Sequence, residues 1–145
     1  MIILDTNVVS EPLKRQPDAV VLAWLDAQPP QSLYLTTVNI AELLAGVEVL
    51  PVGKRRDALK EALLQQVIPL FDGRILAFDH KAAEAFAKIH AKVQAAGQPI
   101  GFADGAIAAM AWAHGFAVAT RNVRDFLGCG IDVINPWEHH APAQS

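Results

Sequence analysis

The sequence contains little cysteine and no long apolar run. Its single cysteine, Cys129, excludes an internal disulfide framework. It is compatible with a reducing cytoplasm, which we expect to be the location of the protein. No apolar stretch approaches the roughly 20 residues that cross a bilayer. The chain starts with an apolar run and an acid rather than with a basic segment, so we expect no signal peptide.

An excess of positive charge is also missing. The formal net charge is −3, from 12 Lys and Arg against 15 Asp and Glu. Proteins that bind nucleic acid regardless of sequence usually present a basic face. The one basic cluster, Lys54-Arg55-Arg56 with Lys60 a turn later, is typical of a solvated helix face, with a phosphate contact as the alternative. An acidic protein can still act on nucleic acid if metal ions bridge its carboxylates to phosphate.

The sequence does have the composition of one folded domain. It has 145 residues, of which 52% are hydrophobic and 19% charged, which argues against disorder. We expect the domain to span residues 1–138 and residues 139–145 to form a disordered tail. Within that tail, His139-His140 is more typical of an exposed pair than of a metal site.

Strands and helices are expected to alternate along the chain. Short apolar runs bounded by polar residues predict strands, and apolar residues at helical spacing, with Pro or Gly at the breaks, predict helices. The expected strands are 2–4, 33–36, 74–78, 116–120 and 131–134, and the expected helices are 12–28, 37–50 (capped by Thr37 or Asn39), 54–67, 79–96 and 101–114. This order predicts an α/β domain with a mainly parallel sheet of about five strands, and the two helices between 37 and 67 predict a helical hairpin.

Three acids lie at the ends of these elements. Asp5 ends the first strand, and Glu42 and Asp104 are expected in the first turns of helices. Each alone is explained by helix capping, because carboxylates are stabilised at helix N-termini. Their apolar neighbours, however, argue against a solvated face. The three together are better explained by a shared hard cation, Mg²⁺ or Mn²⁺, which prefers oxygen ligands.

Other chemistries find less support. No Cys or His spacing suggests zinc, no glycine-rich phosphate loop is present, and Ser10 and Ser32 lack the setting of a nucleophile elbow. After the fourth expected strand, Asn122 and Asp125 are further candidate ligands, and Thr120 is placed to orient a carboxylate or water. The alternative for this segment is a turn leading to a short helix.

Five segments together resemble the PIN domain nucleases, and within them the VapC-type toxins of bacterial toxin–antitoxin pairs, in their FitB-like branch. The segments are Leu4 to Pro12 (LDTNVVSEP), Thr37 to Leu43 (TVNIAEL), Ala103 to Ala109 (ADGAIAA), Ala119 to Phe126 (ATRNVRDF) and Asn135 to Trp137 (NPW). The resemblance implies a three-layer α/β/α fold and a metal-dependent endoribonuclease. It also implies a small DNA-binding antitoxin whose tail blocks the acidic site, and a homodimer.

The resemblance further implies roles for particular residues. Asp5, Glu42 and Asp104 would match the core acids, with Asp5 and Asp104 as direct Mg²⁺ ligands. The family often has an acid directly after the Thr-Arg pair, whereas here Asn122 holds that place and Asp125 lies three residues on, so the fourth ligand is left open. By this resemblance a metal-bound water would serve as nucleophile, held by Glu42.

The remaining site residues are expected to play supporting roles. Thr6 and Asn7 are expected to orient the substrate or Asp5, and Thr120 to act through the residues it touches. Repulsion among the clustered acids is expected to raise the pKa of at least one of them when no metal is bound.

Two other functions remain open. In the first, the chain is a catalytically weak partner that represses transcription together with its antitoxin, and its acids receive an Arg from that partner. In the second, it is an Asp-nucleophile phosphatase or receiver domain. The second lacks the required acid at position 7, where Asn stands, and lacks the paired acids of receivers.

Overall fold

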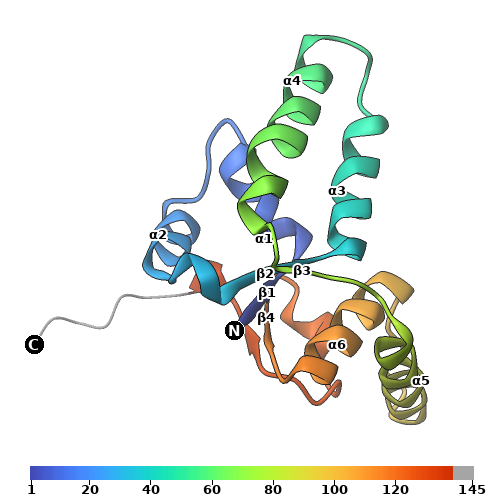
Figure 1. The fold of residues 1–145 in the computed structure, drawn as a ribbon. Coiled ribbons are helices and arrows are strands. Elements are labelled where there is room, and N and C mark those ends of the chain that lie inside the picture. The colour runs from blue at the N-terminus through green and yellow to red at the C-terminus, as the bar shows by residue number, and fades with distance from the viewer. Residues whose placement is uncertain (139–145) are drawn as a thin grey trace, which may run out of the picture.

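The computed structural model describes residues 1–138, so the expected tail at 139–145 and its histidine pair lie outside the described residues. Five parallel strands form one sheet in the order β3-β2-β1-β4-β5. The strands are β1 (Ile2–Leu4), β2 (Leu33–Thr36), β3 (Ile75–Leu76), β4 (Ala117–Ala119) and β5 (Val133–Ile134). Helices cover both faces of the sheet (Figure 1), which confirms the three-layer α/β/α prediction.

One face of the sheet carries the first four helices, α1 (Thr6–Ser10), α2 (Ala19–Ala27), α3 (Thr37–Glu48) and α4 (Lys54–Ala62). Their apolar side chains pack over buried residues of β1, β2 and β4. The chain leaves α4 through a π-helical segment, η3 (Leu63–Val67), and a 3-10 segment, η4 (Ile68–Phe71). Helices α3 and α4 form the predicted hairpin and project away from the sheet (Figure 1).

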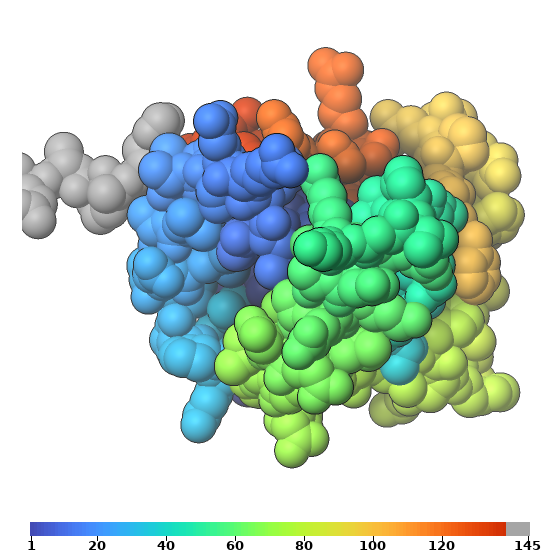
Figure 2. Space-filling view, turned by 90° about the horizontal axis from the view of Figure 1, so that it is seen from above, coloured from blue at the N-terminus to red at the C-terminus, as the bar shows by residue number. Residues whose placement is uncertain are grey.

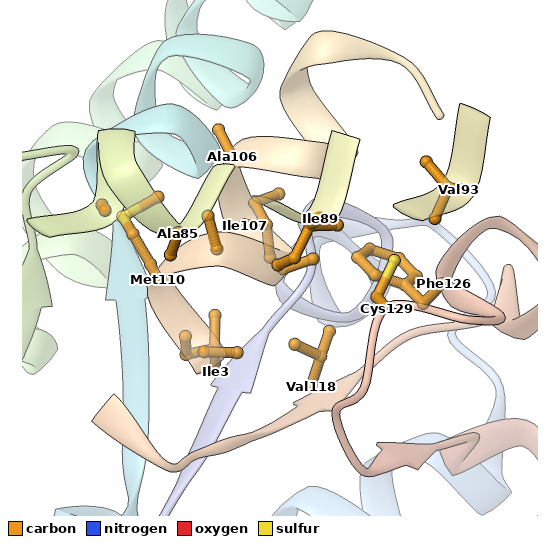
Figure 3. Close-up of a cluster of buried hydrophobic side chains, with 14 residues drawn as sticks. Ile3, Ala85, Ile89, Val93, Ala106, Ile107, Met110, Val118, Phe126 and Cys129 are labelled. Carbon is orange, nitrogen blue, oxygen red and sulfur yellow. The ribbon is translucent and has the colours of Figure 1, made fainter. Parts of the chain in front are cut away.

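The opposite face carries α5 (His80–Ala95) and α6 (Phe102–His114). Figure 3 shows Ile3 and Val118, from the adjacent strands β1 and β4, beneath Ile107 and Met110 of α6. All four side chains are fully buried, and each such burial stabilises the fold by about 1.5–3 kcal/mol. The buried face of α6 is rich in alanine, which lets α5 approach closely.

Gly105 lies at a close contact between α5 and α6. A Cβ atom at this position would lie 2.8 Å from Cε2 of Phe86, so no larger residue fits unless the Phe86 ring moves. This close approach fixes the position of the first turn of α6, which includes the neighbouring Asp104.

Several boundaries differ from those predicted. The helix expected at 12–28 begins at Ala19, because Asp18 caps it through two backbone N–H groups, and a separate helix, α1, follows Asp5 directly. The strand expected at 74–78 is only two residues long, because it lies at the sheet edge and pairs with β2 alone. The cap of α3 is Thr36 rather than Thr37 or Asn39.

Short 3-10 segments complete the described chain: η1 (Glu11–Leu13), η2 (Pro30–Ser32), η5 (Val123–Phe126) and η6 (Pro136–Glu138). The segment η5 is the short helix that was the alternative prediction after the fourth strand. In the part of the chain that the structure describes, no helix is long and apolar enough to span a membrane.

Candidate functional site

The carboxyl edge of the sheet gathers most of the predicted site residues. Because the strands are parallel, β1, β2, β4 and β5 all end at this edge. Asp5 follows β1, Thr120 follows β4, and Asn135 follows β5. Ligand sites of open parallel sheets lie at such edges, beside the central strands.

Asp5 is held in place by two hydrogen bonds. Its side chain is buried, with 5% of the residue exposed. Its Oδ1 atom accepts from the backbone N–H of Thr6 at 2.8 Å, and its Oδ2 atom accepts from the hydroxyl of Thr120 at 2.8 Å. Burial raises the pKa of Asp5 and repulsion from Asp125 adds to the rise, while the two hydrogen bonds oppose it. Asp5 therefore both caps α1 and presents a fixed carboxylate at the sheet edge.

Glu42 reaches this edge through Thr6. The Thr6 hydroxyl donates to Oε1 of Glu42 at 2.9 Å and accepts from Nδ2 of Asn39 at 3.3 Å. Glu42 lies in the second turn of α3, not the first as predicted, because the cap is Thr36 rather than Asn39, which places the first helical residue at Thr37. Glu42 is also exposed. The prediction that it does not lie on a solvated face, which was based on its apolar neighbours, was therefore wrong.

Asn39 is a supporting residue that the sequence reasoning missed as part of the site. It is fully buried, and its Oδ1 atom accepts from the hydroxyl of Thr36 at 2.7 Å and from the backbone N–H of the same residue at 3.0 Å. Its backbone N–H donates in return to the Thr36 hydroxyl, which completes a capping box. The spacing Thr-x-x-Asn at the start of a helix is the signal that could have found it.

Asp104 lies in the first turn of α6, as predicted. Its pKa is raised to about 6, first by burial and then by repulsion from three other acids, Asp5, Asp125 and Glu42. The expected raised pKa among the clustered acids is therefore present. Each of these three acids therefore lies close enough to Asp104 to repel its carboxylate.

Asn122 and Asp125 follow β4 in the segment that leads through η5. The backbone N–H of Asn122 donates to the Thr120 hydroxyl at 3.0 Å. Asp125 is exposed and contributes to the raised pKa of both Asp5 and Asp104. The side chain of Asn7 accepts from the backbone N–H of Arg121 at 3.3 Å, so it ties α1 to this segment.

The four acids have no cationic partner within residues 1–138, where none of them forms an ion pair with Lys, Arg or His. Their donors are oxygen atoms, which suit a hard divalent cation. Within those residues, no group of three or more His, Cys, Asp or Glu side chains is arranged so that it could hold a metal ion.

The structure thus combines a five-stranded parallel sheet, helices on both of its faces, and acids near its carboxyl edge. Residues 2–127 match the PIN domain, and the chain belongs to the PIN domain family. The resemblance stated from the sequence is thereby confirmed.

The sequences of individual relatives align with this chain over almost their whole length. The chain is 49% identical to the VapC ribonuclease Y4jK of Sinorhizobium fredii, over 95% of this chain and 99% of the relative. It is 46% identical to the toxin FitB of Neisseria gonorrhoeae, over 94% and 99%. A solved structure of FitAB bound to an IR36 DNA fragment aligns with a TM-score of 0.93 at 43% identity, covering 98% of this chain and 99% of the other.

Proposed function

We propose that this chain is a metal-dependent endoribonuclease and the toxin of a toxin–antitoxin pair. The observation that carries the proposal is that Asp5, Asp125 and Glu42 all lie near enough to Asp104 to raise its pKa, with no cationic partner for these acids among the described residues. The substrate class follows from the relatives, which are named as a VapC ribonuclease and a toxin. We further propose a small DNA-binding antitoxin as partner, a homodimer as the assembly and the cytoplasm as the location.

Asp5 and Asp104 are the proposed ligands of the cation, which we take to be Mg²⁺ with Mn²⁺ as a substitute. When bound, such a cation polarises a phosphoryl oxygen and lowers the pKa of a coordinated water. The chain would contribute one proposed ligand, Asp5, in a fixed orientation. Asp5 cannot rotate freely, because both of its oxygen atoms accept hydrogen bonds, and each retains a lone pair for a further contact.

Glu42 is the proposed residue that orients the attacking water. Its Oε1 atom is held by Thr6, which in turn is held by Asn39, so the carboxylate faces the site on a short chain of hydrogen bonds. The exposure of Glu42 gives it access to solvent and to a substrate backbone. Asp125 adds negative charge at the same edge, and Asn122 has an exposed amide beside it. We propose these two residues as the further ligands, direct or through water.

A second candidate function is transcriptional repression together with the antitoxin. The observation that favours it is the solved relative, which was captured as a FitAB complex on DNA. The net charge of −3 is consistent with the partner making the DNA contacts. Both functions can belong to one protein, because cleavage requires the acidic site whereas repression requires only binding to an antitoxin that contacts DNA.

The test is cleavage of structured RNA by the purified chain, with Mg²⁺ or Mn²⁺ and with a chelator. We expect cleavage only with the metal, and a loss of at least about 100-fold in Asp5→Asn and in Asp104→Asn. Asp132→Asn is the matched control, because Asp132 is exposed and precedes β5, away from the carboxyl edge. Full activity in Asp5→Asn or Asp104→Asn contradicts the proposal. Absence of cleavage, together with tight operator binding by the complex, favours repression instead.

A further inference from the structure

The Asn135-Pro136-Trp137 motif has no role in the site as described, yet it lies beside it. Its Asn135 lines a recess of about 450 Å³ at the carboxyl edge of β4 and β5. The recess is also lined by Arg121 and Arg124, and by two acids, Asp125 and Glu138. Asp125 also repels Asp5 and Asp104, so the recess shares one acid with the proposed cation site.

Trp137 holds the side chain of Arg121. The guanidinium carbon of Arg121 lies 5.2 Å from the centre of the Trp137 ring. A guanidinium stacked on a ring is restrained, while the N–H donors in its plane remain able to bind a planar or tetrahedral anion in a bidentate manner. Trp137 is itself fixed, since its backbone N–H donates to Oδ1 of Asn135 at 3.0 Å and Pro136 is buried.

The backbone of Arg121 is equally constrained. It directly follows Thr120, whose hydroxyl binds Asp5, and its N–H donates to Asn7. Arg121 is therefore placed one residue from a group that touches the proposed metal ligand. Asn7 and Thr120 therefore fix the backbone of Arg121 beside the proposed metal ligand, while Trp137 restrains its guanidinium.

The two arginines are exposed and form no ion pair with a carboxylate within residues 1–138, although Asp125 and Glu138 line the same recess. The arginines would repel a cation held by the neighbouring acids, so they are unsuited to help bind it. They are well suited to bind the phosphates that flank the scissile bond of a nucleic acid. Arginine is the usual residue for such bidentate phosphate contacts.

We propose that this recess binds a phosphate of the RNA strand that neighbours the scissile phosphate, with Arg121 as the principal contact, Arg124 as a second contact and Trp137 as the positioning residue. This inference rests on the proposed ribonuclease function for the identity of the polyanion. It assigns Asn135-Pro136-Trp137 to substrate placement rather than to chemistry.

The experiment measures binding of a short labelled single-stranded RNA of mixed sequence to full-length protein that carries Asp104→Asn to prevent cleavage. In this background we expect Arg121→Gln to weaken binding about tenfold, the loss of one charge-assisted bidentate contact. The slope of log affinity against log salt should fall by about 0.7, as for one phosphate. Trp137→Leu should weaken binding by a smaller factor, and Glu138→Gln should strengthen it.

The control is Lys88→Gln, which removes the same charge from an exposed residue that lines a different recess with Trp112 and Gly130. We expect it to leave affinity and salt slope unchanged. Equal effects of Arg121→Gln and Lys88→Gln, an unchanged salt slope in Arg121→Gln, or no RNA binding at all would overturn the inference.

The cleaving protein separates this inference from the function on which it rests. In otherwise wild-type protein, Arg121→Gln should raise KM with little change in kcat. If wild-type protein cleaves RNA and Arg121→Gln leaves KM unchanged, the recess proposal fails alone. If wild-type protein cleaves no RNA with any metal, the proposed function fails, and the binding measurements still decide whether the recess takes a phosphate.

Discussion

The hydroxyl of Thr120 donates a 2.8 Å hydrogen bond to Oδ2 of Asp5, joining the ends of β4 and β1 across 115 residues of sequence. Both residues are buried. The same hydroxyl accepts from the backbone N–H of Asn122 at 3.0 Å. One side chain thus sets the direction of the proposed metal ligand and the start of the segment that carries Asp125.

Replacing Thr120 should therefore disturb the site and the fold together. Thr120→Val leaves Oδ2 of Asp5 and the N–H of Asn122 without this partner, at a cost of about 1–3 kcal/mol in the free energy of unfolding. It should also raise the pKa of Asp5 further, since the lost hydrogen bond lowers it. Urea denaturation checks the stability. Thr120→Ser keeps the hydroxyl and should stay near wild type, and a Val variant as stable as the Ser variant would refute this role.

Asn39 should support both stability and activity. It touches none of the proposed ligands, and it acts on Glu42 only through Thr6. Asn39→Ala removes the acceptor for Thr36 and the donor to Thr6, both at a fully buried position. We expect a loss of about 2–3 kcal/mol in stability and a drop in kcat, because Thr6 no longer fixes Glu42. Gln28→Ala is the control, since it removes an amide that donates to a helix carbonyl nearer the surface. Similar losses in the two variants would count against the network.

Asp104 should make metal-free stability depend on pH. Its pKa is about 6 in the folded chain against 3.8 for the free side chain, so the folded state binds more protons than the unfolded state between these values. The free energy of unfolding therefore falls as pH rises from about 4 to about 6, because the folded state resists ionisation of Asp104. At higher pH this loss stays constant. Asp104→Asn should raise stability at pH 7 by about 1 kcal/mol, after allowance for solvent screening, or about 3 °C in Tm.

The controls for this prediction compare wild-type protein with Asp104→Asn at low pH and in the presence of metal. Thermal unfolding in a chelator should show the advantage of Asp104→Asn shrinking toward zero near pH 4. It should also shrink or reverse in Mg²⁺, because a bound cation stabilises the wild-type carboxylate. An advantage that is equal at pH 4 and pH 7 would contradict the raised pKa.

Two helix glycines should respond in opposite directions to alanine. Gly105→Ala places a Cβ 2.8 Å from Phe86 and should cost about 1–3 kcal/mol, since the ring must shift. Gly46→Ala in α3 meets nothing within 4 Å and should stabilise the protein by about 0.5–1 kcal/mol. Chemical denaturation measures both. Gains in both variants would show that the contact between α5 and α6 is looser than described.

The sequence was sufficient to predict the fold and the strand ends at which Asp5 and Thr120 lie. Short apolar runs that end at Asp5 and before Thr120 mark strand ends, and parallel strands bring such ends to one edge whatever their separation in sequence. It was less informative about helix starts. Placing Glu42 depended on the cap of α3, and Thr36 looks like a strand residue until its bond to Asn39 is seen.

The contacts between distant segments could not be read from sequence. The Thr6–Glu42 hydrogen bond and the stacking of Arg121 on Trp137 depend on the conformations of the segments that follow the strands. No local spacing encodes them. Exposure was also misjudged, because apolar neighbours on a helix bury one side only, and Glu42 lies on the other.

The most direct measurement is a calorimetric titration of the metal-free chain with Mn²⁺, in place of Mg²⁺, near pH 7. The account predicts saturable binding, weakened at least about tenfold in Asp5→Asn and in Asp104→Asn and unchanged in Asp132→Asn. Below about pH 6, binding should release protons, because Asp104 must ionise. Equal affinity in all four proteins would contradict the claim that these carboxylates hold the cation.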